Sequence, residues 1–146
     1  MDESLVYAAD LIAALAHKGQ CDKQGNPYIE HPRHVASKFH SAKYKATALL
    51  HDVIEDTSVT EADLRPIFGD EITDALVLLT HDPSVPYLAY IEALKFNKLA
   101  RAVKSEDLRH TSDTERWKDE IPEHFVRKIR ECYIPALKIL EHQGDV

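Results

Sequence analysis

The sequence is poor in cysteine and has no long apolar run, and each shortage excludes a class of protein. Two cysteines, Cys21 and Cys132, are too few for a disulfide framework and lack the CxxC spacing of a zinc or redox site. The longest early apolar run, 11–16, is far too short to span a bilayer, and the acidic N-terminus differs from the basic start of a secretory signal. We therefore expect a cytoplasmic protein with reduced thiols and no membrane partner.

Basic residues are also in the minority. The chain has 18 Lys and Arg against 25 Asp and Glu, which gives a net charge of −7. An acidic surface repels a polyphosphate backbone and no basic patch offsets it, so we expect no nucleic-acid partner. A small anionic substrate stays compatible with this charge if a metal ion binds it. The 146 residues, 44% of them hydrophobic, predict one globular domain and exclude disorder.

Glycine is scarce, with four residues, and apolar residues recur at three- and four-residue spacing, which predicts an all-α fold. Thr60 and Asp63 form a predicted capping box, Asn97 a predicted N-cap, and Pro135 a predicted kink in the last helix. Residues 20–32 hold two prolines, a glycine and an asparagine and predict a loop. The expected helices cover 4–17, a segment from 32, 44–55, 60–69, 70–80, segments from 86 and 97, and 123–141.

The densest ionisable cluster is His51, Asp52, Glu55 and Asp56, inside the predicted helix 44–55. At about 100° per residue these side chains fall within an arc of roughly 140°, opposite an apolar face. Three carboxylates and an imidazole on one face repel one another unless a cation or water screens them. A solvated acidic face is one interpretation, and a metal site is the other. The apolar run around His51 and Asp52 argues against a solvated face, because solvation there is poor, and the pattern alone leaves both interpretations open.

Three segments occur in a recognisable order along the chain: Tyr28-Ile29-x-His31-Pro32, His51-Asp52-x-x-Glu55-Asp56 and Val103-Lys104-x-x-Asp107. Together they resemble the HD-domain hydrolases of the RelA/SpoT type, especially the small stand-alone members. The similarity also includes 16–20 and 79–91, and so covers most of the chain. It implies a single compact all-α HD-type bundle over residues 1–146, without a synthetase domain.

The resemblance also implies a divalent ion, usually Mn²⁺. The implied ligands are His31, His51, Asp52 and Asp107. Glu55 and Asp56 would orient or deprotonate the water that attacks phosphorus, since a carboxylate beside the ion can accept its proton. The implied reaction releases the 3′-pyrophosphate of guanosine tetra- or pentaphosphate.

Cations and a hydroxyl near these motifs are candidate substrate contacts. They are Lys18, Lys23, Lys104, Arg109 and Thr111. Three positions depart from the family pattern. Asp22 replaces an arginine that packs on guanine, Thr111 replaces an asparagine that contacts the sugar, and Glu106 adds a negative charge near the site.

Two alternatives therefore stay open. One is an HD-domain phosphohydrolase for a different nucleotide or phosphate ester. The other is a nucleotide-binding regulatory module with weak turnover. The sequence does not indicate an oligomeric state.

Overall fold

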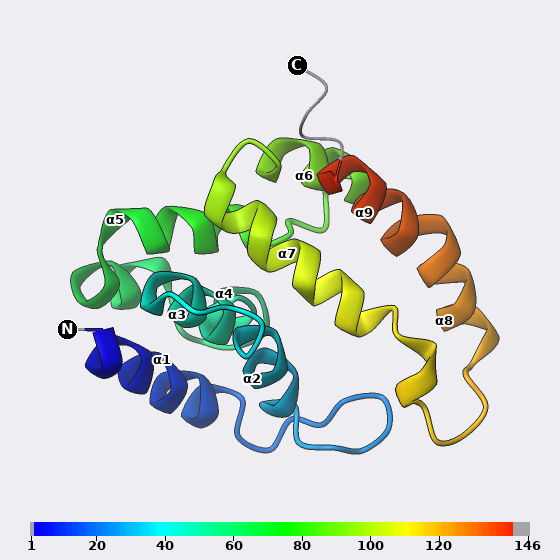
Figure 1. Ribbon diagram of the computed structural model, residues 1–146, viewed down its shortest axis with the longest axis horizontal. Helices are drawn as coiled ribbons and strands as arrows, with labels where there is room; N and C mark the ends of the chain where they lie inside the picture. The colour runs from blue at the N-terminus through cyan, green and yellow to red at the C-terminus, as the bar shows by residue number, and fades with distance from the viewer. Residues whose placement is uncertain (1, 142–146) are drawn as a thin grey trace.

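The computed structural model describes residues 2–141, which fold into helices joined by short loops (Figure 1). The helices are α1 (Asp2–Ala16), α2 (Glu30–Ala36), α3 (Ala42–Leu50), α4 (Val53–Asp56), α5 (Glu61–Leu79), α6 (Tyr87–Leu94), α7 (Lys98–Thr111), α8 (Glu123–Lys128) and α9 (Ile134–Glu141). A 3-10 turn, Thr114–Arg116, follows α7, and a π-helix, Ile129–Tyr133, joins α8 to α9. Within 2–141 the only strand-type pairing is an isolated bridge between Cys21 and Pro27. The predicted all-α class is confirmed.

Helix α7 occupies the centre of the bundle. It contacts α2, α3, α5 and α9, while α1 packs against α3 (Figure 1). The apolar side chains of α7, Leu99, Val103 and Leu108, are buried against these neighbours. This arrangement brings a side chain of α7 close to residues that lie 50 to 80 positions earlier in the chain. No helix in the described residues is long and apolar enough to cross a membrane.

The predicted capping box at the start of α5 is confirmed. The Thr60 hydroxyl accepts a hydrogen bond from the Asp63 amide at 3.2 Å, and the Asp63 carboxylate accepts one from the Thr60 amide at 3.0 Å. The predicted break at Gly69 is also present, because this glycine has a φ of +83° inside α5. Arg65 spans the break, with ion pairs to Glu61, Asp70 and Asp74.

The predicted continuous helix over 44–55 is wrong. Helix α3 ends at Leu50 and α4 begins at Val53, so His51 and Asp52 lie in a turn between them. The His51 ring places Nδ1 2.6 Å from the Ala48 carbonyl oxygen, and Asp52 has φ −109° and ψ 0°, away from regular helical geometry. The break points both side chains toward α2 and α7 instead of along one helical face.

Helices α1, α2 and α3 each begin two residues earlier than predicted, α3 at Ala42 instead of Tyr44, and the last predicted helix is not a single α-helix. Helix α1 begins at Asp2 instead of Ser4, and α2 at Glu30 instead of Pro32, which still lies in the first turn, where its missing N–H costs nothing. In 123–141 the disturbance around Pro135 takes the form of the π-helix just before it. Proline lacks the N–H that a regular turn would use, and the wider π turn accommodates this.

We expect Thr60→Ala to lower the free energy of unfolding by about 1 kcal/mol, because it removes the side-chain half of the capping box. Urea denaturation followed by circular dichroism measures this change. Ser58→Ala, an exposed neighbour, is the control and should leave the midpoint unchanged. Equal stability of the two variants would contradict the structural role of Thr60.

Candidate active site

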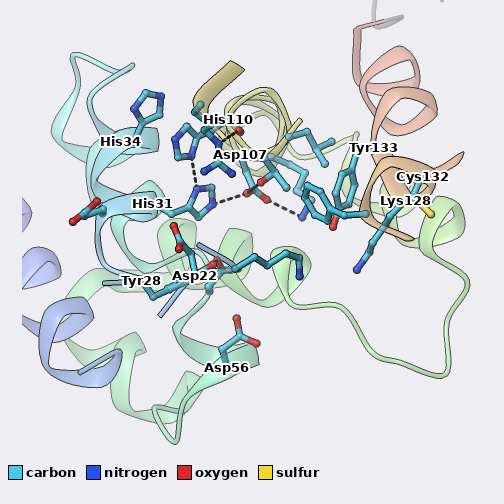
Figure 2. A pocket seen from close by; sticks show the side chains of 18 of the residues that line it. Asp22, Tyr28, His31, His34, Asp56, Asp107, His110, Lys128, Cys132 and Tyr133 are labelled. Atoms are coloured by element: carbon cyan, nitrogen blue, oxygen red, sulfur yellow. Dashed lines mark hydrogen bonds and ion pairs between the residues drawn. The ribbon is translucent and has the colours of Figure 1, made fainter. Parts of the chain in front are cut away.

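A cavity of about 680 Å³ lies among the loop before α2, the turn between α3 and α4, helix α7 and the α8–π-helix segment (Figure 2). His31, Asp52 and Asp107 line it, together with Glu55 and Asp56. Three segments far apart in sequence therefore contribute to one site, as the order of the motifs predicted.

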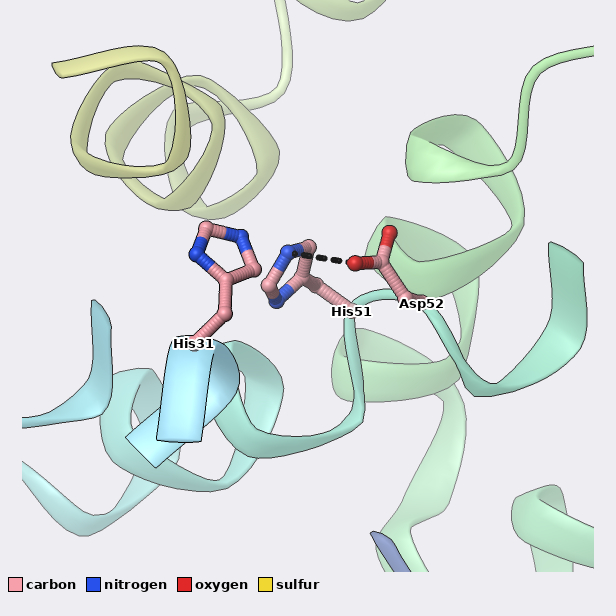
Figure 3. Close-up of side chains that lie close together, drawn as sticks. All are labelled: His31, His51 and Asp52. Atoms are coloured by element: carbon pink, nitrogen blue, oxygen red, sulfur yellow. Dashed lines mark ion pairs between the residues drawn. The ribbon is translucent and has the colours of Figure 1, made fainter. Parts of the chain in front are cut away.

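Three of the predicted metal ligands form a tight group. One donor atom each from His31, His51 and Asp52 lies within 4.8 Å of the others (Figure 3). Asp107 Oδ1 approaches both imidazoles, at 2.8 Å from His31 Nε2 and 3.6 Å from His51 Nε2. The structure thus brings the side chains of all four predicted ligands together, as two imidazole rings with two carboxylates beside them.

The protonation state of His51 follows from its surroundings. Nδ1 lies 2.6 Å from the Ala48 carbonyl oxygen, which can only accept, so Nδ1 carries the hydrogen. In the neutral ring, the Nε2 lone pair then faces Asp52 Oδ2 at 3.1 Å, and Nε2 makes no hydrogen bond. His51 is only 2% exposed, so water cannot compensate. A lone pair beside carboxylate oxygens requires a cation or a proton there.

His110, a residue that the sequence analysis did not select, contacts the ring of His31. His31 Nδ1 lies 2.7 Å from His110 Nδ1, and the two rings are stacked (Figure 2). Burial lowers the pKa of His110 to about 4, so the ring is neutral at pH 7 and its Nδ1 can accept. His31 Nε2 faces Asp107. The i, i+3 spacing of Asp107 and His110 on α7 was the signal available in the sequence.

Asp107 is the most enclosed carboxylate of the group. Burial acts to raise its pKa, but Lys104 Nζ at 2.9 Å and the neighbouring histidines hold that pKa well below its usual range. Burial would likewise lower the pKa of Lys104, and Asp107 raises it well above the usual value. Thr111 Oγ1 also donates to Asp107 Oδ1, at 3.3 Å. Asp107 therefore stays ionised inside the protein.

Tyr28 orients the second acidic ligand. Its hydroxyl donates a short hydrogen bond to Asp52 Oδ2, and its ring lies against the rings of His17 and His31. Burial, and then the Asp52 charge, raise the pKa of Tyr28 far above its usual value, so the hydroxyl remains a donor. Tyr28 belonged to the quoted motif, but the motif alone did not show this contact.

Glu55 and Asp56 lie on α4 and face the cavity from its edge. Glu55 Oε1 accepts a hydrogen bond from the His81 amide at 2.7 Å. Burial, followed by the charges of Asp52 and Glu55, raises the pKa of Asp56 to about 6. The site therefore holds carboxylates that differ in proton affinity, which suits acid–base chemistry.

Only some of the predicted substrate contacts reach the cavity. Lys23, Lys104 and Thr111 line it, whereas Lys18 and Arg109 are not among its lining residues. Arg109 is paired instead with Glu106 at 2.6 Å and Glu141 at 3.2 Å. Glu106 is likewise absent from the lining, so its charge is directed toward Arg109 and away from the cavity.

Asp22 stabilises the loop before α2 through side-chain hydrogen bonds. Its Oδ1 accepts hydrogen bonds from the amides of Gln24 and Asn26, each at 2.9 Å, and its Oδ2 accepts one from the Asn26 side chain at 3.3 Å. Its carboxylate therefore shapes the loop. The described structure thus provides no arginine side chain at the position where the family pattern has one.

The donor set fits a divalent cation. The arrangement combines the Nε2 atoms of His31 and His51 with the ionised carboxylate oxygens of Asp52 and Asp107. Neutral imidazole and carboxylate together suit first-row divalent metals such as manganese. His51 Nε2 is buried, makes no hydrogen bond within residues 2–141, and faces the carboxylates of Asp52 and Asp107.

Comparison with known proteins matches this chain to one family. A family model described as HD domain matches residues 6–84. A probable guanosine-3′,5′-bis(diphosphate) 3′-pyrophosphohydrolase of Mycoplasma pneumoniae is 41% identical over 96 residues, 63% of this chain and 12% of that protein. The bifunctional (p)ppGpp synthase/hydrolase SpoT of Escherichia coli is 44% identical over 70 residues, 45% of this chain and 10% of that protein. The matched region is therefore a small part of each relative.

A solved structure shows the same fold over nearly the whole chain. It is described as a metazoan ortholog of SpoT that hydrolyzes ppGpp. The TM-score is 0.66 with 20% identity, and the match covers 98% of this chain and 97% of that one.

We expect Mn²⁺ to raise the melting temperature of chelator-treated protein by roughly 10 °C at a hundredfold excess over Kd, because it binds only the folded state. Asp52→Asn should abolish this rise, since it removes a charge but keeps an oxygen for the Tyr28 hydroxyl. Asp119→Asn, the same change at an exposed position, should keep it. Differential scanning fluorimetry reports both. A rise of equal size in Asp52→Asn would contradict the assigned site.

We expect Asp56→Asn to stabilise the metal-free protein at pH 7.5. The folded pKa of about 6 exceeds the ordinary 3.8, so the folded state binds the proton more tightly and ionised Asp56 opposes folding above pH 6. Solvent screening of this exposed group reduces the expected gain to about 1 kcal/mol. The gain should shrink as the pH falls through 6 and vanish near pH 4. Denaturation across this range measures it, and a gain that persists at pH 4 would contradict the cause.

Proposed function

This chain belongs to the HD-domain family, and we propose that it is a metal-dependent phosphohydrolase that releases pyrophosphate from the 3′ position of (p)ppGpp. One observation carries the proposal. The Nε2 atoms of His31 and His51 converge with the carboxylates of Asp52 and Asp107 at the wall of a cavity that also holds an acidic pair on α4. The similarity to (p)ppGpp hydrolases supports the choice of substrate.

In this proposal His31, His51, Asp52 and Asp107 hold one divalent ion, and Mn²⁺ is the first candidate. When bound, the ion supplies charge that stabilises the phosphoryl oxygens and lowers the pKa of water. Tyr28 and His110 keep two of the ligands in the required orientation, through the bonds to Asp52 and His31. Lys104 offsets the charge of Asp107, which keeps this carboxylate ionised next to an anionic substrate.

Glu55 and Asp56 are the proposed catalytic residues. Glu55 orients the attacking water and accepts its proton, while its carboxylate is fixed by the His81 amide. Asp56, on the same short helix, faces the same cavity and shares in orienting or deprotonating that water. The water oxygen forms a new bond to the phosphorus attached to the ribose, and the bond from that phosphorus to the ribose 3′ oxygen breaks. The 3′ oxygen takes up a proton and becomes a hydroxyl, and the two phosphoryl groups are released as pyrophosphate that contains the water oxygen.

Two of the cations that line the cavity, and a hydroxyl, are the proposed substrate contacts. Lys23 and Lys104 contribute positive charge, and Thr111 a hydroxyl, at the cavity wall. Lys18 and Arg109, also expected as contacts, are not carried into the proposal because neither lines the cavity. We further propose that the protein is cytoplasmic, is a single domain over 1–146 and has no nucleic-acid partner.

A second candidate substrate is another nucleotide or phosphate ester. The observation that favours it is the use of Asp22 in shaping the loop, which leaves the guanine-packing position without a guanidinium group. The metal ligands and the acidic pair would be used in the same way with such a substrate.

The decisive experiment is product release from ppGpp with Mn²⁺, run beside a panel of ordinary nucleotides and phosphate esters. We expect GDP and pyrophosphate from ppGpp, and a loss of at least 100-fold in kcat for Glu55→Gln with the Mn²⁺-induced rise in melting temperature unchanged. Glu123→Gln, the same change at an exposed site outside the cavity, is the control.

Turnover of another panel member alone would replace the substrate. Absence of turnover for every member, in protein that binds Mn²⁺, would overturn the enzymatic proposal in favour of a regulatory module.

A further inference from the structure

We propose that His81 and Gln20 are positioning residues that hold α4, and with it Glu55 and Asp56, in the geometry required for turnover. The inference rests on the proposed function, because it concerns the same acidic pair. The two residues lie 61 positions apart in the chain, and neither is placed among the metal ligands.

Helix α4 needs external support because it is a single turn of four residues. A helix this short is not stable by itself, because ordering its first turn costs more free energy than the hydrogen bonds of that turn provide. Val53 is its only fully buried side chain, and its closest helical neighbour is α5. The position of the acidic pair therefore depends on the groups that bond to this turn.

The first support acts on the carboxylate of Glu55. The backbone amide of His81 donates to Glu55 Oε1 at 2.7 Å, across 26 residues of sequence. A hydrogen bond to an ionised acceptor is among the stronger kinds and is directional. It fixes one oxygen of Glu55 and leaves the other available to the cavity.

The side chain of His81 fixes the loop that presents this amide. Its Nε2 lies 2.7 Å from the Val85 carbonyl oxygen, an acceptor, so Nε2 donates and closes the loop between α5 and α6. The ring also packs against Tyr90 at a centroid distance of 4.7 Å. Tyr90 in turn donates to the Leu79 carbonyl oxygen at 2.5 Å, which ties α6 to the end of α5. The amide of residue 81 is therefore held at a defined place.

The second support acts on the backbone of Asp56. Gln20 Nε2 donates to the Asp56 carbonyl oxygen at 3.2 Å, one of the carbonyl groups that the end of a helix leaves unbonded. The Gln20 amide is oriented by His17, whose Nδ1 lies 3.0 Å from Gln20 Oε1. His17 is 2% exposed, so it forms a rigid base for this contact.

The two supports restrain different parts of the turn. One fixes a reacting carboxylate directly, and the other fixes the main chain beside it. Because a general base acts only within hydrogen-bond reach of its water, a displacement of about 1 Å is enough to reduce the rate strongly. Metal binding should be unaffected, since neither support touches His31, His51, Asp52 or Asp107.

The test compares His81→Ala, His81→Gln and Gln20→Ala with the unaltered protein. We expect His81→Ala to reduce kcat by about 10- to 100-fold, with KM and the Mn²⁺-induced rise in melting temperature unchanged. Glutamine carries an N–H donor at a similar reach, so His81→Gln should recover most of the activity. Gln20→Ala should also lower kcat selectively. Asp119→Asn, at an exposed position outside the cavity, is the control and should be neutral.

A readout independent of turnover is the amide resonance of residue 81 in a ¹H–¹⁵N spectrum of the metal-free protein. Glu55→Gln changes the charge of the acceptor and should shift this resonance while the Ser84 resonance stays in place. Glu55 is exposed, so Glu55→Gln should fold even if His81→Ala does not.

The inference would be overturned if Glu55→Gln left the chemical shift of the residue 81 amide unchanged. Unchanged kcat in both His81→Ala and Gln20→Ala would also overturn it. If ppGpp is not a substrate, the spectrum still decides whether His81 holds Glu55, so the two proposals fail separately.

Discussion

The contact between the buried carboxylate of Asp107 and the polar groups around it is the interaction on which the rest of the structure depends. Removing an ionised carboxylate from water is costly unless partners replace the water. Lys104, His31 and Thr111 supply those partners from α7 itself and from α2. The same contact joins the central helix to the N-terminal motif, so the forces that assemble the bundle also assemble the site.

Much of the site was predictable from the order of the motifs, because residue types at fixed spacing carry the chemistry of metal binding. His31, His51 and Asp52 meet as predicted, and Asp107 reaches the same rings from α7. The helix break was not predictable from periodicity. Apolar spacing continues through 44–55, whereas the break arises from a side-chain bond between His51 and the Ala48 carbonyl. A hydrophobic pattern does not show where a side chain competes with the helix for a backbone carbonyl group.

Other features depended on contacts between distant segments and so lay beyond sequence reasoning. Arg109 was an attractive phosphate ligand by proximity to Asp107, yet it occupies the opposite side of α7, paired with Glu106 and Glu141. His81 carried no metal spacing, and its relevance comes from a main-chain amide that no side-chain motif describes. Capping residues such as Thr60 were predictable because their partners lie only three positions away.

The π-helix at Ile129–Tyr133 has a consequence for how this cavity wall can vary. A π turn contains one residue more than the α turn it replaces, so it shifts the phase of everything before it by about 100° around the helix axis. Phe125 and Lys128 on one side of it and Tyr133 within it all line the cavity. Deleting a single residue there would turn Phe125 and Lys128 away from the substrate while leaving α9 packed on α7. A difference of one residue in the length of this turn would therefore change which side chains line this wall of the cavity.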